Sequence, residues 1–67
     1  MDGEAALDKE ELRALSLVAD GYAAQRVARV LGVSDATLRR RLKRAAEKLG
    51  ANSRINAVYL AARRGLI

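Results

Sequence analysis

The residues of this sequence best suited to chemistry are basic side chains crowded into one stretch of ten positions. Between positions 39 and 48 the chain carries six Lys or Arg residues and a single acid, Glu47. Lysine and arginine bind phosphate groups, and the flat guanidinium of arginine also matches the edge of guanine. The basic residues are Arg39, Arg40, Arg41, Lys43, Arg44 and Lys48. This pattern indicates the binding of a polyanion rather than catalysis.

The residue types that enzymes and metal sites depend on are scarce. The chain has 67 residues and contains neither Cys nor His. That composition excludes a thiolate nucleophile, a Ser-His-Asp triad and a Cys/His zinc site. No apolar run is long enough to cross a membrane or to serve as a signal peptide. We therefore expect a protein that is not an enzyme, binds no cofactor, metal or small molecule, and stays in the cytoplasm, where it is made.

Length and composition predict one small helical domain. The chain has no Pro, a net charge of +5, and 13 basic residues, of which ten are Arg. Ala, Leu, Arg and Glu are good helix formers, and glycines separate the periodic segments. We predict an all-α fold of four helices at about 9–20, 24–31, 35–49 and 54–64. Residues 7–67 would form the domain, and residues 1–6 a flexible acidic tail.

Capping residues and apolar spacing support these four helices. Asp8 and Glu11 predict a capping box, Ser34 predicts the start of the third helix, and Asn52 or Ser53 that of the fourth. Apolar residues at helical spacing predict the face that each helix buries. In chain order, these faces are Leu12, Leu15, Val18 and Ala19; Val27, Ala28 and Leu31; Leu38, Leu42, Ala45 and Leu49; and Ile55, Val58, Tyr59 and Ala62.

The join between the second and third helices is short enough to predict a helix-turn-helix. Only residues 32–34 separate the two helices, and the first of them is Gly. If the apolar stripe of the third helix faces the core, Arg39, Arg40, Lys43 and Lys48 point away from it. Neighbouring like charges destabilise an isolated helix, and a polyanion offsets that cost. An α-helix fits the major groove of DNA but not that of A-form RNA, so we predict duplex DNA as the partner.

Short motifs recur along residues 7–67 in a specific order. They are Leu7…Glu11-Leu12…Leu15…Val18-Ala19-Asp20-Gly21, Val27-Ala28…Leu31-Gly32-Val33-Ser34…Thr37-Leu38-Arg39…Leu42, Lys48-Leu49-Gly50-Ala51-Asn52-Ser53-Arg54…Ala57-Val58, and Arg64-Gly65-Leu66-Ile67. Together they closely resemble the LuxR/GerE-type helix-turn-helix domain. The resemblance implies a four-helix bacterial DNA-binding domain that regulates transcription as a dimer paired through its fourth helix. The length resembles the stand-alone form of this family.

The resemblance also assigns roles to individual residues. It implies base contacts from Arg39, Arg40 and Lys43. It implies contacts to the DNA backbone from Gln25, Ser34, Thr37 and Arg41, with Arg44 and Lys48 as further phosphate ligands. The implied dimer interface consists of Ala57, Val58, Ala61 and Ala62.

The sequence departs from the family pattern at three places. Arg41 stands where the family commonly has His, Ala24-Gln25 where it has Asn-Lys, and Asp8-Lys9 where it has Thr-Pro. The change at Ala24-Gln25 predicts weaker phosphate contacts from the second helix.

Two other interpretations remain open at the level of sequence. Residues 33–45 also resemble the promoter-binding helix-turn-helix of sigma-factor region four, although residues 49–67 do not. The chain could instead be a protein-interaction module that acts on RNA polymerase or another regulator, through Ala57, Tyr59, Ala61 and Ala62 on the fourth helix. Substitution of the arginines at 39 and 40 separates these classes, because only a DNA-binding protein loses duplex affinity.

Overall fold

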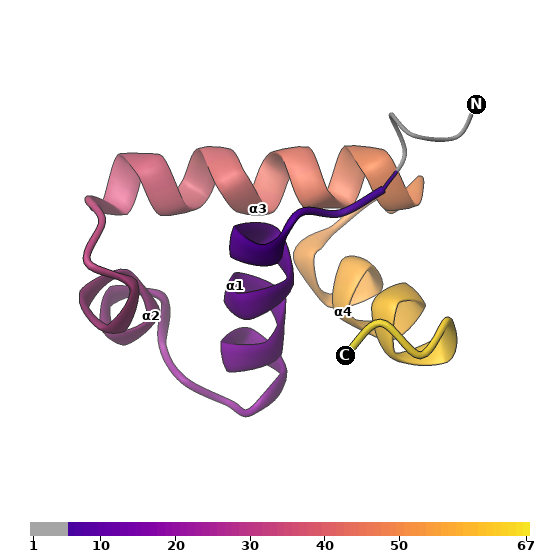
Figure 1. Ribbon diagram of the computed structural model, residues 1–67, viewed down its shortest axis with the longest axis horizontal. Helices are drawn as coiled ribbons and strands as arrows, with labels where there is room; N and C mark the ends of the chain where they lie inside the picture. The colour runs from indigo at the N-terminus through magenta and orange to yellow at the C-terminus, as the bar shows by residue number, and fades with distance from the viewer. Residues whose placement is uncertain (1–5) are drawn as a thin grey trace.

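Four α-helices joined by short turns form the computed structural model, which describes residues 6–67 (Figure 1). The helices are α1 (Lys9–Ala19), α2 (Ala24–Leu31), α3 (Asp35–Leu49) and α4 (Arg54–Arg63). The described part contains no strand, and none of its helices is long and apolar enough to cross a membrane. The predicted all-α fold is confirmed, with helix ends within one residue of those expected. Of the predicted acidic tail at 1–6, residues 1–5 lie outside the described part.

Side-chain caps determine where three of the helices begin. The Asp8 carboxylate accepts a hydrogen bond from the Glu11 backbone N–H at 2.8 Å, and the Glu11 carboxylate accepts one from the Asp8 N–H at 2.9 Å. This is the predicted capping box. Ser34 and Ser53 each accept a hydrogen bond from the N–H three residues further on, at 3.1 and 3.0 Å. Ala23 precedes α2 and has no such side chain, so α2 begins without a side-chain cap.

Glycines end α2 and α3 in the left-handed conformation. Gly32 has φ 72° and Gly50 has φ 74°, a region where a Cβ is disfavoured. No atom lies within 4 Å of where a Cβ would stand at either glycine, so the requirement is one of backbone conformation rather than of space. The Gly32 turn leaves only residues 33 and 34 before α3 starts, which completes the predicted helix-turn-helix.

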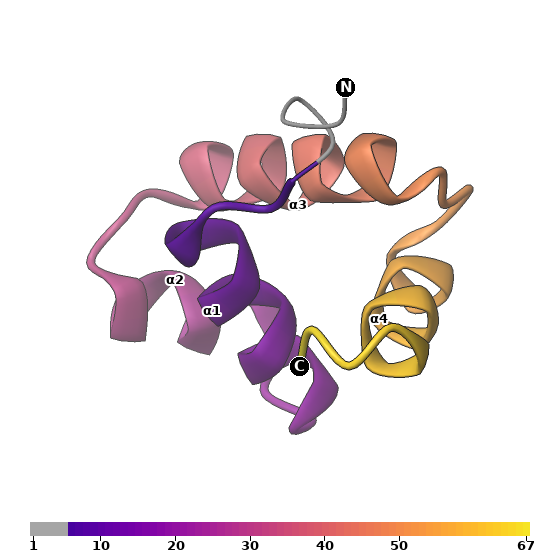
Figure 2. The ribbon, with the colours of Figure 1, turned by 45° about the vertical axis from the view of Figure 1, so that its right-hand side comes forward.

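The longest helix, α3, lies against all three of the others. It contacts α1, α2 and α4, whereas α2 and α4 make no contact with each other. Figures 1 and 2 show α3 spanning the domain, with α2 and α4 near its opposite ends. The core that these helices share consists of Ala14, Leu15, Val27, Ala28, Leu38, Leu42, Ala45, Leu49, Ala57 and Ala61.

The predicted buried face is confirmed for α3, whereas on α4 only Val58 of the four predicted residues packs against the core. All four residues of the α3 stripe are buried, and α1 buries Ala14 and Leu15 but exposes Ala19. On α4 the buried residues are Ala57 and Ala61, whereas Ile55 is 82% exposed. The α4 sequence is apolar on every side, so its periodicity does not select one face. The small side chains of the two alanines face the core, since they allow the closest approach of backbones.

One carboxylate is buried within this apolar core. Glu11 is only 3% exposed, and besides capping α1 its Oε1 accepts a hydrogen bond from Lys48 Nζ at 2.9 Å. The carboxylate thus joins the beginning of α1 to the last turn of α3. Because a buried charge is costly without partners, the two donors are what allow Glu11 to be buried. No buried side-chain N or O atom within residues 6–67 lacks a hydrogen-bond partner.

We expect Glu11→Ala to lower the free energy of unfolding by about 2–4 kcal/mol, because it leaves the Lys48 ammonium without its anion and removes part of the cap. Glu10→Ala is the matched control, since Glu10 is the adjacent glutamate and pairs with Arg41 in an exposed position. Exposed pairs contribute about 0–1 kcal/mol. Urea denaturation followed by circular dichroism measures both losses, and equal losses would contradict a structural role for Glu11.

Candidate nucleic-acid interface

The start of α3 is held by two hydroxyl groups. Ser34 Oγ accepts a hydrogen bond from the Thr37 N–H, and the two side-chain oxygens, Ser34 Oγ and Thr37 Oγ1, lie 3.0 Å apart in a second hydrogen bond. Ser34 is exposed and Thr37 half-buried. Both residues are predicted backbone contacts, and both lie at the surface where α3 begins.

The side of α3 opposite its apolar stripe is a row of exposed cations. Arg39, Arg40, Lys43 and Arg44 are all exposed, and we call these four residues the basic face. None of them forms an ion pair or a side-chain hydrogen bond with another residue in the 6–67 range. The expectation that Arg39, Arg40 and Lys43 point away from the core is confirmed. The four charges are therefore available to an external anion.

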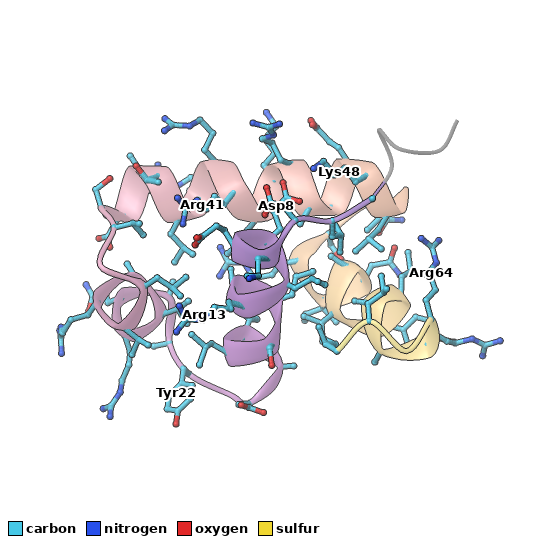
Figure 3. The ribbon with its side chains drawn as sticks, viewed as in Figure 1. Asp8, Arg13, Tyr22, Arg41, Lys48 and Arg64 are labelled. Carbon is cyan, nitrogen blue, oxygen red and sulfur yellow. The ribbon has the colours of Figure 1, made fainter. Side chains whose placement is uncertain are left out.

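Two other basic residues of α3 turn toward α1 instead. Arg41 Nη1 lies 3.3 Å from Glu10 Oε1 in an exposed pair, and Lys48 Nζ lies 2.9 Å from the buried Glu11 carboxylate (Figure 3). The prediction that Lys48 points outward is wrong, because its side chain is 20% exposed and lies against α1. Positions 41, 45 and 48 share one side of a helix, and buried Ala45 lies on that side.

The edge between α2 and α3 brings further predicted residues together. Gln25 and Ser34 line one open hollow. Gln25 also lines a second one, where it is joined by Arg39 and by Arg54 from the start of α4. Arg54 is not among the site residues that the sequence predicts. A signal was present nonetheless, because a cation in the first turn of a helix opposes the helix dipole and so calls for an explanation.

The predicted dimer residues do not share one exposed surface. Ala57 and Ala61 are only 1% and 0% exposed within the single chain, and their assignment to a dimer interface stays a prediction. Val58 is half-buried and Ala62 exposed. The exposed apolar side of α4 instead carries Ile55 and Tyr59, which are 82% and 54% exposed, together with Ala62.

Comparisons with known proteins agree with this architecture. Residues 5–61 match the family described as "Bacterial regulatory proteins, luxR family". The chain is also similar to the "Transcriptional regulatory protein YdfI" of Bacillus subtilis (strain 168), with 39% identity over 64 residues. That match covers 96% of this chain and 30% of the relative, so the chain spans about a third of the relative's length.

The family match covers the capping box of α1, the helix-turn-helix and most of α4. It also decides between the two resemblances found in the sequence, in favour of LuxR/GerE over sigma-factor region four. Proteins of this family are regulators rather than enzymes. The chain therefore belongs to the LuxR/GerE family of bacterial regulatory proteins, as a helix-turn-helix DNA-binding domain of a transcriptional regulator.

Proposed function

We propose that this protein binds specific sequences of duplex DNA by inserting α3 into the major groove. The observation that carries the proposal is the basic face, in which four exposed cations of one helix have no partner among the described residues. An α-helix fits the major groove, where each base pair presents a distinct pattern of donors and acceptors. Regulation of transcription from bacterial promoters follows from such binding.

Within this interface we assign the base contacts to Arg39, Arg40 and Lys43. An arginine bidentate to guanine O6 and N7 contributes about 1–3 kcal/mol of discrimination against the wrong base. Arg44, further along the same face, would contact phosphate, as would Gln25, Ser34 and Thr37 at the α2–α3 edge. Such contacts fix the register of α3 and supply affinity without sequence preference.

Arg41 and Lys48 differ in whether they are free to bind DNA. The Arg41–Glu10 pair is exposed and of the kind that contributes about 0–1 kcal/mol, so a phosphate group can replace Glu10. The Lys48 ammonium is the partner of a buried carboxylate, and its departure would leave that carboxylate unpaired. We therefore place Arg41 among the residues that contact the DNA backbone and leave Lys48 out.

We further propose that the protein binds as a homodimer through the exposed side of α4. Ile55 and Tyr59 are large apolar residues one turn apart, and a second copy would remove both from water. A two-fold dimer must hold its α3 helices about 34 Å apart to enter successive major grooves on one side of the duplex.

Binding is tested by fluorescence anisotropy on duplex and single-stranded DNA over a salt series. We expect duplex to be preferred and log K to fall steeply with log salt. Sequences selected from a random pool then supply a cognate duplex. Absence of duplex binding at low salt would favour the alternative in which the basic face serves a protein partner, such as RNA polymerase.

We expect Arg40→Ala to weaken binding to the selected duplex about 5- to 100-fold, and to weaken binding to random duplex far less, because a base contact is lost. Arg44→Ala is the matched control, since it removes the same charge from the same face and should weaken both duplexes alike. Anisotropy titrations at one salt concentration measure these ratios. Equal losses on both duplexes for Arg40→Ala would remove Arg40 from base recognition.

We expect Tyr59→Glu to abolish self-association and cooperative binding to a duplex with two half-sites, while leaving single half-site affinity unchanged. Burial of a glutamate between two copies is costly. Tyr22→Glu is the control, because Tyr22 is the other exposed tyrosine and lies outside α4. Sedimentation velocity with and without DNA measures the oligomeric state, and a wild-type protein that remains monomeric in both conditions would refute the dimer.

A further inference from the structure

We propose that Arg54 is an additional phosphate ligand, and that the hollow between α3 and the start of α4 receives a phosphate group of the DNA backbone. This inference rests on the proposed DNA binding and adds a residue to it from outside the helix-turn-helix. Three observations support it: the position of Arg54 beside the basic face, the charges that line the hollow, and the lack of a partner for those cations among residues 6–67.

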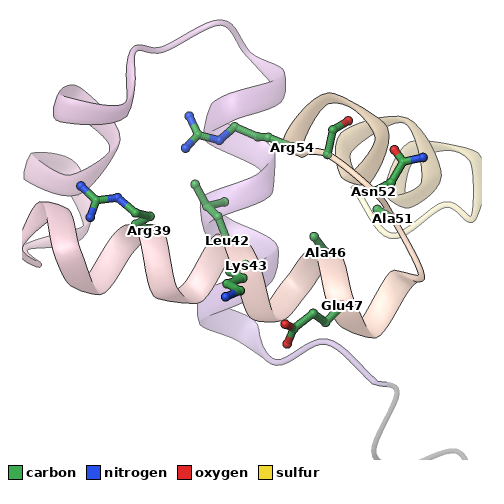
Figure 4. A pocket seen from close by; sticks show the side chains of 9 residues that line it. Arg39, Leu42, Lys43, Ala46, Glu47, Ala51, Asn52 and Arg54 are labelled. Carbon is green, nitrogen blue, oxygen red and sulfur yellow. The ribbon is translucent and has the colours of Figure 1, made fainter.

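The hollow lies directly beside the basic face. Its volume is about 370 Å³, and its walls are formed by α3, by the loop at residues 51–53 and by the first residue of α4. Leu42 and Ala46 line its apolar part, and Arg39, Lys43 and Arg54 bring their charges to it (Figure 4). A smaller hollow of about 190 Å³ on the α2 side shares two of these residues, Arg39 and Arg54. These two arginines therefore stand at the junction of both hollows.

The charges lining these hollows are predominantly positive. Each contains one acid, Glu47 in the larger and Asp35 in the smaller. Neither acid forms an ion pair with Arg39, Lys43 or Arg54 among residues 6–67. An anion is thus attracted to the part of the site that holds Arg39 and Arg54.

Arg54 differs from several other cations in having no internal partner within the described range. Arg41 and Lys48 pair with glutamates, and Arg64 donates a hydrogen bond to the Leu49 carbonyl at 3.1 Å. Arg54 instead stands near two like charges and in the first turn of α4, which carries no acid. The neighbouring positive charges and the positive end of the helix dipole both disfavour a cation at this position. A phosphate group bound by Arg54, beside Arg39, offsets both, and guanidinium is well suited to bidentate contact with phosphate.

The source of that phosphate is the duplex itself. Arg39 and Lys43 belong to both the basic face and the hollow, so an α3 helix that lies in the major groove brings the hollow against the edge of the groove. The phosphates of the backbone line that edge. Arg54 would then contact DNA without reading its sequence, and would do so from α4 rather than from the helix-turn-helix.

The test is the salt dependence of duplex binding by Arg54→Gln. Loss of one phosphate contact reduces the magnitude of the slope of log K against log salt by about 0.9. We expect that reduction, together with equal fold-losses on selected and random duplexes. Arg13→Gln is the matched control, because it removes the same charge from an exposed position of α1 and should leave the slope at its wild-type value. Arg54→Lys should restore most of the slope, and melting curves verify that all variants fold.

The possible outcomes separate this inference from the proposed function. A wild-type protein without duplex affinity overturns the proposed function and this inference with it. A steep wild-type slope that Arg54→Gln leaves unchanged overturns only the role of Arg54. A larger loss on selected than on random duplex would make Arg54 a base contact and overturn the phosphate assignment. Inorganic phosphate that shifts the Arg54 side-chain NMR signals without DNA, combined with an unchanged slope, would assign the hollow to a free anion and also overturn it.

Discussion

The candidate site of this domain depends on α3 facing the core on one side and the solvent on the other. Its apolar stripe, ending at Leu49, is the surface on which the other three helices assemble. Its opposite side carries the basic face, including Arg39 and Lys43. Because the stripe fixes the rotation of α3 about its own axis, it also fixes which cations face outward. The direction of the charged side chains is thus a consequence of core packing.

A second constraint is the way that acids of α1 divide the cations of α3. Glu10 and Glu11 in the first turn of α1 hold Arg41 and Lys48 at one flank of the helix. The two pairs are not equivalent, since one is exposed and the other includes a buried carboxylate. The exposed Arg41–Glu10 pair can be broken by solvent or a ligand at little cost in free energy. The Lys48–Glu11 pair cannot, because it would leave a buried carboxylate without its partner. The two adjacent glutamates therefore have different roles. Their burial in the structure reveals this difference, whereas their positions in the sequence do not.

Local signals predicted the helices well, and the orientation of α3 followed from them. The capping box at Asp8, the N-cap at Ser34 and the glycine at 50 each act within one turn of chain, so the sequence contains all that determines them. The outward direction of Arg39 was predictable for the same reason, since a regular stripe leaves only one free side.

Features that depend on how helices cross were not predictable in this way. Lys48 and Glu11 are 37 positions apart, and their contact exists only because α1 and α3 cross at a particular place. The proximity of Arg54 to Arg39 likewise depends on the direction in which α4 leaves the turn at residues 50–53. On α4 the sequence did not select the buried residues, because Ile55 and Ala57 are both apolar and only packing distance decides between them.

If the protein pairs through α4 as proposed, the burial of alanines by α4 links the folding of this domain to its concentration. A helix that fully buries Ala57 and Ala61 while exposing Ile55 and Tyr59 leaves part of its hydrophobic surface without cover from its own chain. Any molecule that covers the exposed side adds its binding free energy to the stability of the folded state by mass action. A cell with few copies of the protein would then hold a less stable domain, more open to proteolysis, than a cell with many. Abundance would in this way regulate the lifetime of the protein as well as the occupancy of its sites.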